Sequence, residues 1–328
     1  MRLTPPLVAL ALLTGCAAQS APEAAPALAG PSAAAPVAGS PAVWKSGMVL
    51  RGAVTVPAGA TVTLDKGAAL TADKGASLVV VGTLLAPAGG SIRGSGWDGL
   101  TVSKGGSVTA SGLTLDGAGI TTATGAGAVT LTGGTVTGAA TPVSVALGST
   151  LTLVDTKVSK VEGTSEVKGT LVGRGLRYDK GSNSGIVFSG SGSALRLSDS
   201  LLFGDGKFNG DMVITDDAGE INVVRSEVRD VHCAFHVVGV GKLELSGLKI
   251  HDNAYGFMAY GSAPTVTHHV TNSDVYDNRD YGLFESPGTV QGRIVVDGGY
   301  WAKNGSSEAA TLTQSTGKIE RLNAAAAP

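Results

Sequence analysis

The chain has 328 residues, of which 49 are Gly and 13 are Pro, and only 15% are charged. So much glycine with so few charges excludes a coiled coil, a helical bundle and a charged disordered chain. The 24 basic and 26 acidic residues nearly balance and form no basic block, so no nucleic-acid partner is expected. No run of 18 apolar residues exists, and we expect no helix that spans a membrane.

The first residues have the pattern of an export signal. Arg2 precedes a short apolar stretch, which is followed by Leu13-Thr14-Gly15-Cys16. This tetrapeptide resembles the lipobox of bacterial lipoproteins. The resemblance implies that residues 1–15 are removed and that Cys16 carries acyl chains, which makes the membrane a partner. In the same family, Ala17 after the cysteine implies sorting to the outer membrane of a two-membrane bacterium.

A low-complexity linker follows the predicted lipidation site. Nearly every residue between Cys16 and Trp44 is Ala, Pro, Gly or Ser, which gives too little apolar surface for folding. Proline stiffens such a segment, and at about 3.1 Å per residue it would reach roughly 80 Å. The expected organisation is a signal peptide over 1–15, a lipidated cysteine and linker over 16–43, a folded domain over 44–305, and a C-terminal cap or tail over 306–328.

From residue 44 onward the chain consists of short segments that alternate aliphatic and small polar residues. One phrase (a small residue, any residue, then an aliphatic or aromatic residue) recurs from Ser111 to Tyr300, with steps of 18 to 27 residues. Such a period predicts a solenoid in which each repeat is one coil of short strands. We expect about 12 coils, spaced near 4.8 Å, with Val228, Leu248 and Val275 in one inward stack.

Two later coils contain a more specific phrase. Asn-Ala-Tyr-Gly-Phe at 253–257 and Asn-Arg-Asp-Tyr-Gly-Leu at 278–283 resemble the Asn-x-x-Tyr-Gly-aliphatic phrase of the pectate-lyase-like superfamily. This resemblance implies an all-β, right-handed parallel β-helix over roughly residues 50–305. It does not imply an activity, because the superfamily includes lyases, hydrolases, epimerases, adhesins and inert scaffolds. Asn at this fixed corner is expected because it tolerates a left-handed backbone and because its amide can bond to the copy in the next coil.

Chemically varied side chains concentrate in the C-terminal half. All five His lie between His232 and His269, and all eight Asn follow residue 182, so any functional surface is expected there. Cys233 lies in an apolar stretch and is predicted to be a small buried hydrophobe. His268 and His269 lack further ligand spacing, so we expect no metal site and no resident cofactor.

Two enzymatic interpretations stay open. Asp216-Asp217, His232 and Arg293-Ile294 loosely follow the chain order of polygalacturonase-like glycosidases, although the flanking Gly and Lys of that family are missing. A lyase or epimerase would need carboxylates, with Ca²⁺ as its cofactor, and groups that move a proton. The candidates for that chemistry are Asp230, Asp252, Asp277, Asp280, Arg279, Tyr255 and His251. Alternation also places Glu285 inward, where its carboxylate would be partly buried.

A binding face without chemistry is the interpretation that we favour. Alternation places His236, Met258 and Phe284 in one outward column, with Tyr255 and Tyr281 beside it and Trp301 beyond. Exposed aromatic rings on successive coils form a platform suited to sugars. The sequence therefore predicts a lipid-anchored envelope protein whose C-terminal coils bind an extended carbohydrate or another envelope component. The alternatives are a polysaccharide lyase, epimerase or hydrolase on the same scaffold, and an inert spacer.

Overall fold

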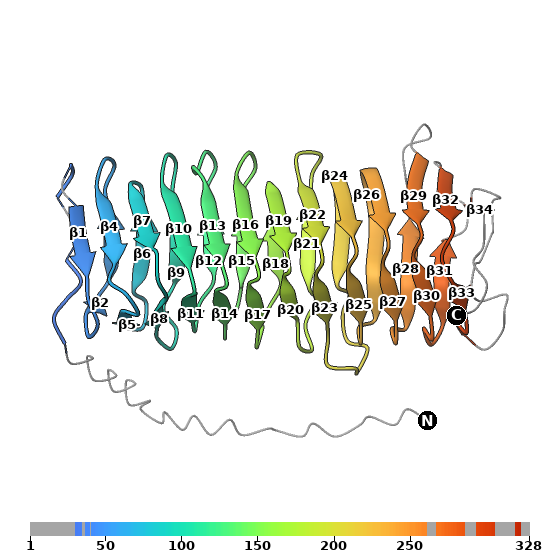
Figure 1. Ribbon diagram of the computed structural model, residues 1–328, viewed down its shortest axis with the longest axis horizontal. Coiled ribbons are helices and arrows are strands. Elements are labelled where there is room, and N and C mark those ends of the chain that lie inside the picture. The colour runs from blue at the N-terminus through green and yellow to red at the C-terminus, as the bar shows by residue number, and fades with distance from the viewer. Residues whose placement is uncertain are drawn as a thin grey trace, which may run out of the picture.

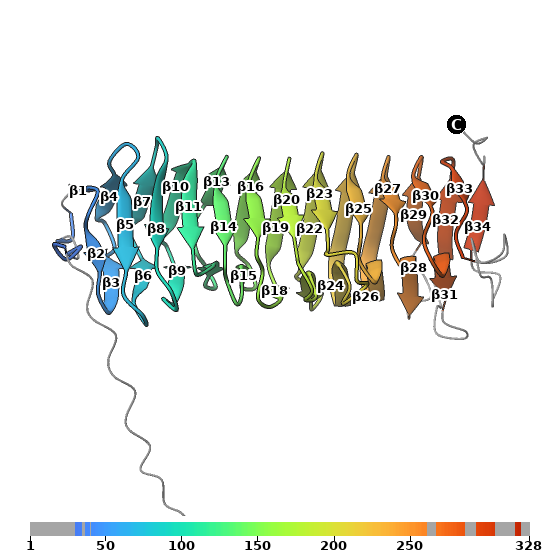
Figure 2. The same cartoon turned by 90° about the horizontal axis from the view of Figure 1, so that it is seen from below.

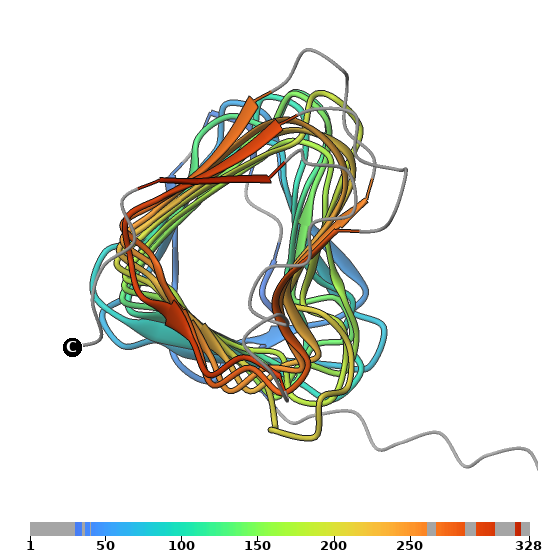
Figure 3. The same cartoon turned by 90° about the vertical axis from the view of Figure 1, so that its right-hand side faces the viewer.

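The computed structural model describes residues 30–34, 37–39, 41–260, 267–285, 293–305 and 319–322. These residues form an all-β parallel solenoid that contains no helix, as predicted (Figure 1). Seen along its axis, the solenoid has three walls around one interior (Figure 3). The walls are three strand faces, which we name A, B and C in the order in which a coil visits them. All pairings between named strands in the described part are parallel, so each strand lies beside its copy in the next coil.

Face A contains twelve strands, in agreement with the expected number of coils. Its strands are β2 (Val49–Leu50), β5 (Ala69–Ala72), β8 (Gly90–Arg93), β11 (Leu113–Asp116), β14 (Thr135–Thr137), β17 (Lys157–Ser159), β20 (Arg177–Asp179), β23 (Leu201–Phe203), β25 (Glu227–Arg229), β27 (Lys249–His251), β30 (Asp274–Tyr276) and β33 (Trp301–Ala302).

Face B follows face A in each coil and carries the outward column predicted from the sequence. Its strands are β3 (Ala53–Val56), β6 (Ser77–Val80), β9 (Gly99–Val102), β12 (Ile120–Thr122), β15 (Val143–Val145), β18 (Ser165–Val167), β21 (Ile186–Ser189), the first halves of β24 (Val213–Val224) and β26 (Cys233–Ser246), β28 (Tyr255–Tyr260) and β31 (Tyr281–Glu285).

Face C completes each coil, and Figure 2 shows the same rod from below. The long strands β24 and β26 turn from face B into face C without a break. The other strands of face C are β1 (Pro41–Trp44), β4 (Thr61–Leu64), β7 (Thr83–Ala86), β10 (Ser107–Ser111), β13 (Val129–Thr132), β16 (Thr150–Val154), β19 (Thr170–Arg174), β22 (Ala194–Ser198), β29 (Thr267–Thr271), β32 (Arg293–Asp297) and β34 (Ile319–Leu322).

Aliphatic columns fill the interior because inward and outward side chains alternate along each strand. Burying one Val, Leu or Ile contributes about 1.5–3 kcal/mol, and the repeated coils supply such side chains throughout. The predicted inward stack of Val228, Leu248 and Val275 contained one wrong residue, because its middle position is occupied by Ile250 and not by Leu248. Val228 and Val275 pair with Ile250, whereas Leu248 precedes that strand. Leu248 is nevertheless buried, because the corner before β27 also turns its side chain inward.

A ladder of asparagines crosses the corner between faces A and B, as the sequence predicted. The Asn253 side-chain amide donates to Asn278 Oδ1 at 3.0 Å, and that of Asn278 donates to Asn304 Oδ1 at 2.7 Å. All three side chains are buried. The expectation that the asparagines themselves adopt a left-handed backbone was wrong. That conformation lies one residue earlier, at Asp252, Asp277 and Lys303, so the asparagines are needed for their amides and not for their φ.

Residues on both sides of the predicted 44–305 domain also pair with it. Strand β1 begins at Pro41, and Ser32 in the predicted linker pairs with Val49. Arg51 donates to the carbonyl oxygen of Gly30 at 3.0 Å, which holds the end of the linker against the first coil. Strand β34 lies in the segment predicted to be a cap or tail, and it continues face C by pairing with β32.

Candidate functional site

A long corner between β23 and β24, residues 204–212, projects from the rod as the yellow-green loop below it in Figures 1 and 3. The corners of the next two coils, 230–232 and 252–254, are much shorter. The loop is bonded to the first of them, because His232 N–H donates to the Gly210 oxygen at 3.1 Å. Phe208 on the loop lies under the guanidinium of Arg279, 4.9 Å from its ring centroid. The loop therefore leans along the rod over the short corners.

Asp211, at the end of this loop, joins two histidines. His232 Nδ1 lies 2.7 Å from Asp211 Oδ1, and His236 Nδ1 lies 2.6 Å from Oδ2. The side chain of Asp211 is only 14% exposed. Burial alone would raise the pKa of this carboxyl, but the hydrogen bonds from the two imidazoles outweigh burial and hold its pKa below the ordinary value. Asp211 is therefore ionised at neutral pH.

An ionised carboxylate only accepts hydrogen bonds. Each imidazole must therefore carry its proton on Nδ1, and in the neutral ring Nε2 is left as an acceptor. His232 and His236 are partly exposed, and Nε2 of neither ring has a hydrogen-bond partner in the described part of the chain. The two Nε2 atoms can accept protons or hydrogen bonds from a ligand, and after protonation they can donate.

Six rings, five on face B and one at the corner before it, form a closed circuit of contacts with Asp211, and we name these six rings the aromatic patch. The rings are His232, Tyr255, Tyr281, Phe284, Tyr260 and His236, and successive ring centroids lie 5.3, 5.7, 5.3, 6.5 and 5.1 Å apart. Asp211 closes the circuit between the two histidines. The contacts hold the rings in place before any ligand arrives.

Met258 lies within this circuit. It pairs with His236 on one side and with Phe284 on the other, which confirms the predicted outward column. Tyr255 and Tyr260 stand at the two ends of its own strand. Although it shares the register of the partly exposed His236 and Phe284, Met258 is only 8% exposed. The patch thus has a flexible apolar floor and a rim of phenol and imidazole groups.

The phenols of Tyr255 and Tyr260 remain protonated at neutral pH. Burial, and then the carboxylate of Asp280, raises the pKa of Tyr255. Burial raises the pKa of Tyr260 as well. Beside Tyr255, Arg279 donates to Asp280 from Nε at 3.0 Å and from Nη2 at 2.6 Å, which keeps the pKa of Asp280 low. The rim therefore offers neutral phenol donors and one ion pair to a ligand.

Trp301 does not belong to the patch, contrary to the sequence-based expectation. It lies on β33 of face A, where it pairs with Val275, and it is 5% exposed. Its position continues the inward column of Val228 and Val275, so the indole fills the core. An outward Trp301 would require the alternation of inward and outward side chains in β33 to be shifted by one residue.

The residues that suggested a glycosidase are not brought together. Asp216 pairs with Val238 on β26, six residues after His232, which corresponds to roughly 20 Å of extended chain. Asp217 adopts a left-handed φ at the turn from face B into face C. Arg293 and Ile294 lie on face C, on β32. The carboxylate nearest His232 is instead Asp211.

The carboxylates that suggested a lyase or epimerase are divided between two places. Tyr255 belongs to the aromatic patch, and Asp280 and Arg279 lie beside it. Asp252 belongs to a separate group, because its Oδ2 lies 2.7 Å from Nδ1 of His251, whose ring stacks on Tyr276 of face A. Asp230 pairs with Arg229, and both Asp230 and Asp277 adopt a left-handed backbone at corners. Glu285 pairs with Ala259, in the predicted inward register, but its side chain lies outside the described residues.

Cys233 and His268 are core residues. Cys233 is buried, and its thiol contacts the carbonyl oxygen of Phe235 at 3.1 Å. Burial raises the pKa of Cys233 well above its ordinary value, so the thiol is unreactive. His268 is 2% exposed, and burial lowers its pKa to about 4. Among the described residues, no group of three or more His, Cys, Asp and Glu side chains is arranged to hold a metal ion.

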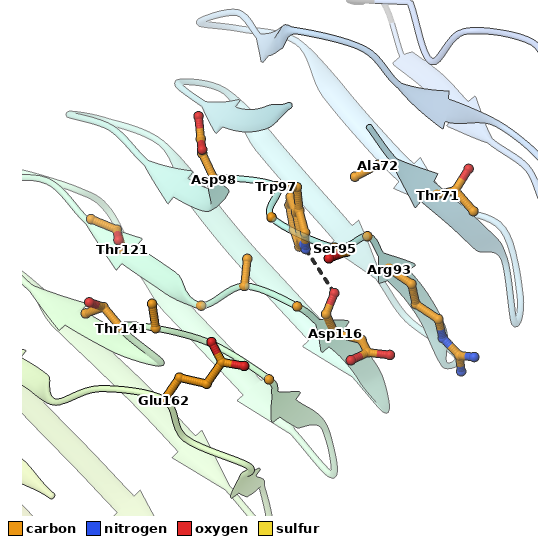
Figure 4. A pocket seen from close by; sticks show the side chains of 17 residues that line it. Thr71, Ala72, Arg93, Ser95, Trp97, Asp98, Asp116, Thr121, Thr141 and Glu162 are labelled. Atoms are coloured by element: carbon orange, nitrogen blue, oxygen red, sulfur yellow. Dashed lines mark hydrogen bonds between the residues drawn. The ribbon is translucent and has the colours of Figure 1, made fainter. Parts of the chain in front are cut away.

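The plain N-terminal coils contain a hollow that the sequence did not suggest. The corner 117–119 has three residues, whereas the corners 94–98 and 138–142 beside it have five, so the coil between them is recessed. The resulting notch has a volume of about 1030 Å³ (Figure 4). Trp97 forms part of its wall and donates its indole N–H to the Asp116 carbonyl oxygen at 2.9 Å. This indole is buried, so it offers no stacking face to a ligand.

Sequence patterns missed Asp211 and Tyr260 as site residues. Asp211 lies in a nine-residue corner that has no counterpart in the other described coils, so no repeat position pointed to it. Tyr260 could have been found, because it lies two residues after Met258 and therefore faces the same side of β28.

Comparison of the chain with protein-family models, with curated proteins and with solved structures gives no match. Within the described ranges, no helix has the length and apolar character needed to cross a membrane.

Proposed function

We propose that this protein is a lipid-anchored protein of the bacterial cell envelope that binds a segment of polysaccharide on its aromatic patch. The observation that carries the proposal is the closed circuit of six rings around Met258, held by Asp211. Ring faces pack against the apolar faces of sugars, and the phenol and imidazole groups of the rim can bond to hydroxyl groups.

The lipid anchor and the outer-membrane location are the second part of the proposal. They rest on Leu13-Thr14-Gly15-Cys16 and on Ala17. The linker joins the rod beside Gly30, at the first coil, whereas the aromatic patch lies on the last coils. Anchored in this way, the rod would hold the patch away from the lipid surface. Cys16→Ala should move the protein from the membrane fraction to the soluble fraction, and a variant that stays in the membrane would contradict the anchor.

A glycan array tests the binding. Full-length protein in detergent micelles should bind at least one neutral or anionic oligosaccharide. The same micelles without protein, and protein unfolded in urea, serve as controls. Absence of binding across the array would contradict the proposal and leave an inert spacer as the better account.

Proton transfer on a bound sugar is a second candidate function, and one observation favours it. His232 and His236 present Nε2 atoms without partners while one ionised carboxylate holds both rings, which is an arrangement suited to general acid–base chemistry. Tyr255 contacts the ring of His232, and Arg279 lies near Tyr255. Prolonged incubation with the polysaccharide that binds would then raise the ultraviolet absorbance if a lyase forms double bonds, or change the sugar configuration if an epimerase acts. A pure binder leaves the polymer unchanged in both assays.

A further inference from the structure

Lys180 is a buried cation that no sequence pattern singled out. It follows β20 in the corner 180–185, and its side chain has no exposed surface. Its ammonium group donates to the backbone carbonyl oxygens of Asn183 and Asn209, and it lies 3.5 Å from that of Gly181. Burying an ammonium group is costly unless hydrogen bonds compensate, and these carbonyls provide them.

Two of these carbonyls belong to different coils. Asn183 lies in the same corner as Lys180, whereas Asn209 lies in the loop 204–212, two residues before Asp211. Lys180 therefore ties the long loop to the preceding corner next to the carboxylate that holds the two histidines. A backbone bond from Gly185 N–H to the Asp211 oxygen, 2.7 Å long, reinforces this link.

The charges around Lys180 agree with this arrangement. Burial lowers the pKa of Lys180, while the carboxylates of Asp205, Asp211 and Asp179 oppose the shift. Loop 204–212 and the corner 180–185 approach each other closely at Gly210. Its φ is +66°, and a Cβ there would lie 2.9 Å from the Asn183 oxygen.

We infer that Lys180 is the positioning residue of the aromatic patch: it fixes loop 204–212 so that the single carboxylate of Asp211 reaches both His232 and His236. Asp211 can bond to both rings only from one narrow position, because each imidazole uses a different carboxylate oxygen. A loop without this cation would lose its bond at Asn209, and Asp211 would move away from at least one ring. The position of Asp211 and of the two rings does not depend on the proposed function. Only the further consequence, that a displaced loop would weaken ligand binding, rests on it.

The test uses ¹⁵N NMR of the histidine rings in the full-length protein without any ligand, at about pH 8, where an ordinary imidazole is neutral. In the wild type, both His232 and His236 should be in the Nδ1–H tautomer. Lys180→Met keeps a long side chain but removes the charge, and we expect at least one of the rings to change tautomer. The His232 amide, which is bonded to Gly210, should exchange with solvent about tenfold faster. Lys168→Met, at an exposed lysine, is the matched control.

A folded Lys180→Met variant with both Nδ1–H tautomers intact would overturn the inference. If Lys180→Met does not fold, Gly210→Ala displaces the same loop while Lys180 is retained, and the tautomers must then change in that variant. Unchanged tautomers in folded Gly210→Ala would equally contradict the link between the loop and the two histidines. Because no glycan is present, these outcomes do not depend on whether the patch binds a polysaccharide. Failure of the proposed function would be seen instead as wild-type protein that binds no glycan.

Discussion

His236 donates its Nδ1 proton to Asp211 Oδ2 at 2.6 Å, although the two residues are 25 positions apart and lie in successive coils. The same carboxylate accepts from His232, which stands before β26 at the adjacent corner. One side chain in an irregular loop therefore orients two imidazoles, one on a regular face and one at the corner before it. The chemistry of the patch depends on this loop more than on the repeat.

Replacing Asp211 with Asn should break at least one of its two hydrogen bonds to the histidines, although the Asn side chain has nearly the same size and shape as Asp. The Asn carbonyl oxygen can accept from one imidazole, but its NH₂ group would face the second Nδ1–H as another donor. At about pH 8 we expect at most one of His232 and His236 to keep the Nδ1–H tautomer in ¹⁵N NMR spectra. Asp216→Asn, at an exposed carboxylate on β24, should leave both tautomers as in the wild type. Two unchanged rings in Asp211→Asn would mean that the carboxylate does not hold them.

The asparagine ladder should be essential for the last coils. Asn278→Ala removes the acceptor of both the Asn253 side-chain amide and the Asn253 backbone N–H, and it removes the side-chain donor to Asn304, so each of these buried groups loses a hydrogen bond. We expect the free energy of unfolding to fall by about 2–4 kcal/mol, as measured by urea denaturation followed by circular dichroism. Asn222→Ala, on the outer side of β24, is the control and should change it by less than about 0.5 kcal/mol. Equal effects of the two substitutions would show that the ladder does not stabilise the coils.

Acid should destabilise the C-terminal coils through His268. Its pKa is about 4 in the folded protein, because the ring is buried and His269 lies next to it, and neither ring nitrogen has a hydrogen-bond partner among the described residues. An unfolded chain binds this proton near pH 6.5, so the unfolded state gains protons first as the pH falls from about 6.5 to 4. The free energy of unfolding should therefore decrease over that range by up to about 3 kcal/mol, and the contribution should level off below it.

Urea denaturation at a series of pH values measures this effect. His268→Leu replaces the buried ring with an apolar side chain of similar size and should remove this part of the pH dependence. His269→Gln, on the outer side of β29, should retain most of it. A wild type and a His268→Leu variant with the same slope between pH 6.5 and pH 4 would contradict the assignment of the slope to this ring.

Periodicity predicted those parts of the structure that repeat. The outward column of His236, Met258 and Phe284 followed from alternation, because one buried face fixes the register of every strand in the stack. The Asn253–Asn278 contact followed from equal spacing along neighbouring coils.

Residues at irregular positions could not be predicted in the same way. Asp211 lies in a corner of unusual length, and Lys180 acts through backbone carbonyls that no side-chain pattern records. Leu248 and Trp301 were misplaced because the phrase used to align the coils does not begin at the same point of every face A strand. Small differences in corner length thus decide which side chains come into contact. A mean repeat period does not contain these differences.

Binding of the glycan selected on the array, measured by calorimetry with wild type, Tyr281→Ala and Tyr300→Ala, tests the central claim most directly. Tyr281 contacts two other rings of the patch, whereas Tyr300 contacts Tyr276 on face A and serves as the matched control. Loss of an aromatic contact of about 1 kcal/mol or more should weaken binding at least fivefold in Tyr281→Ala and leave Tyr300→Ala near the wild type. Equal affinity of Tyr281→Ala and wild type, or a larger loss in Tyr300→Ala, would contradict a ligand site on the aromatic patch.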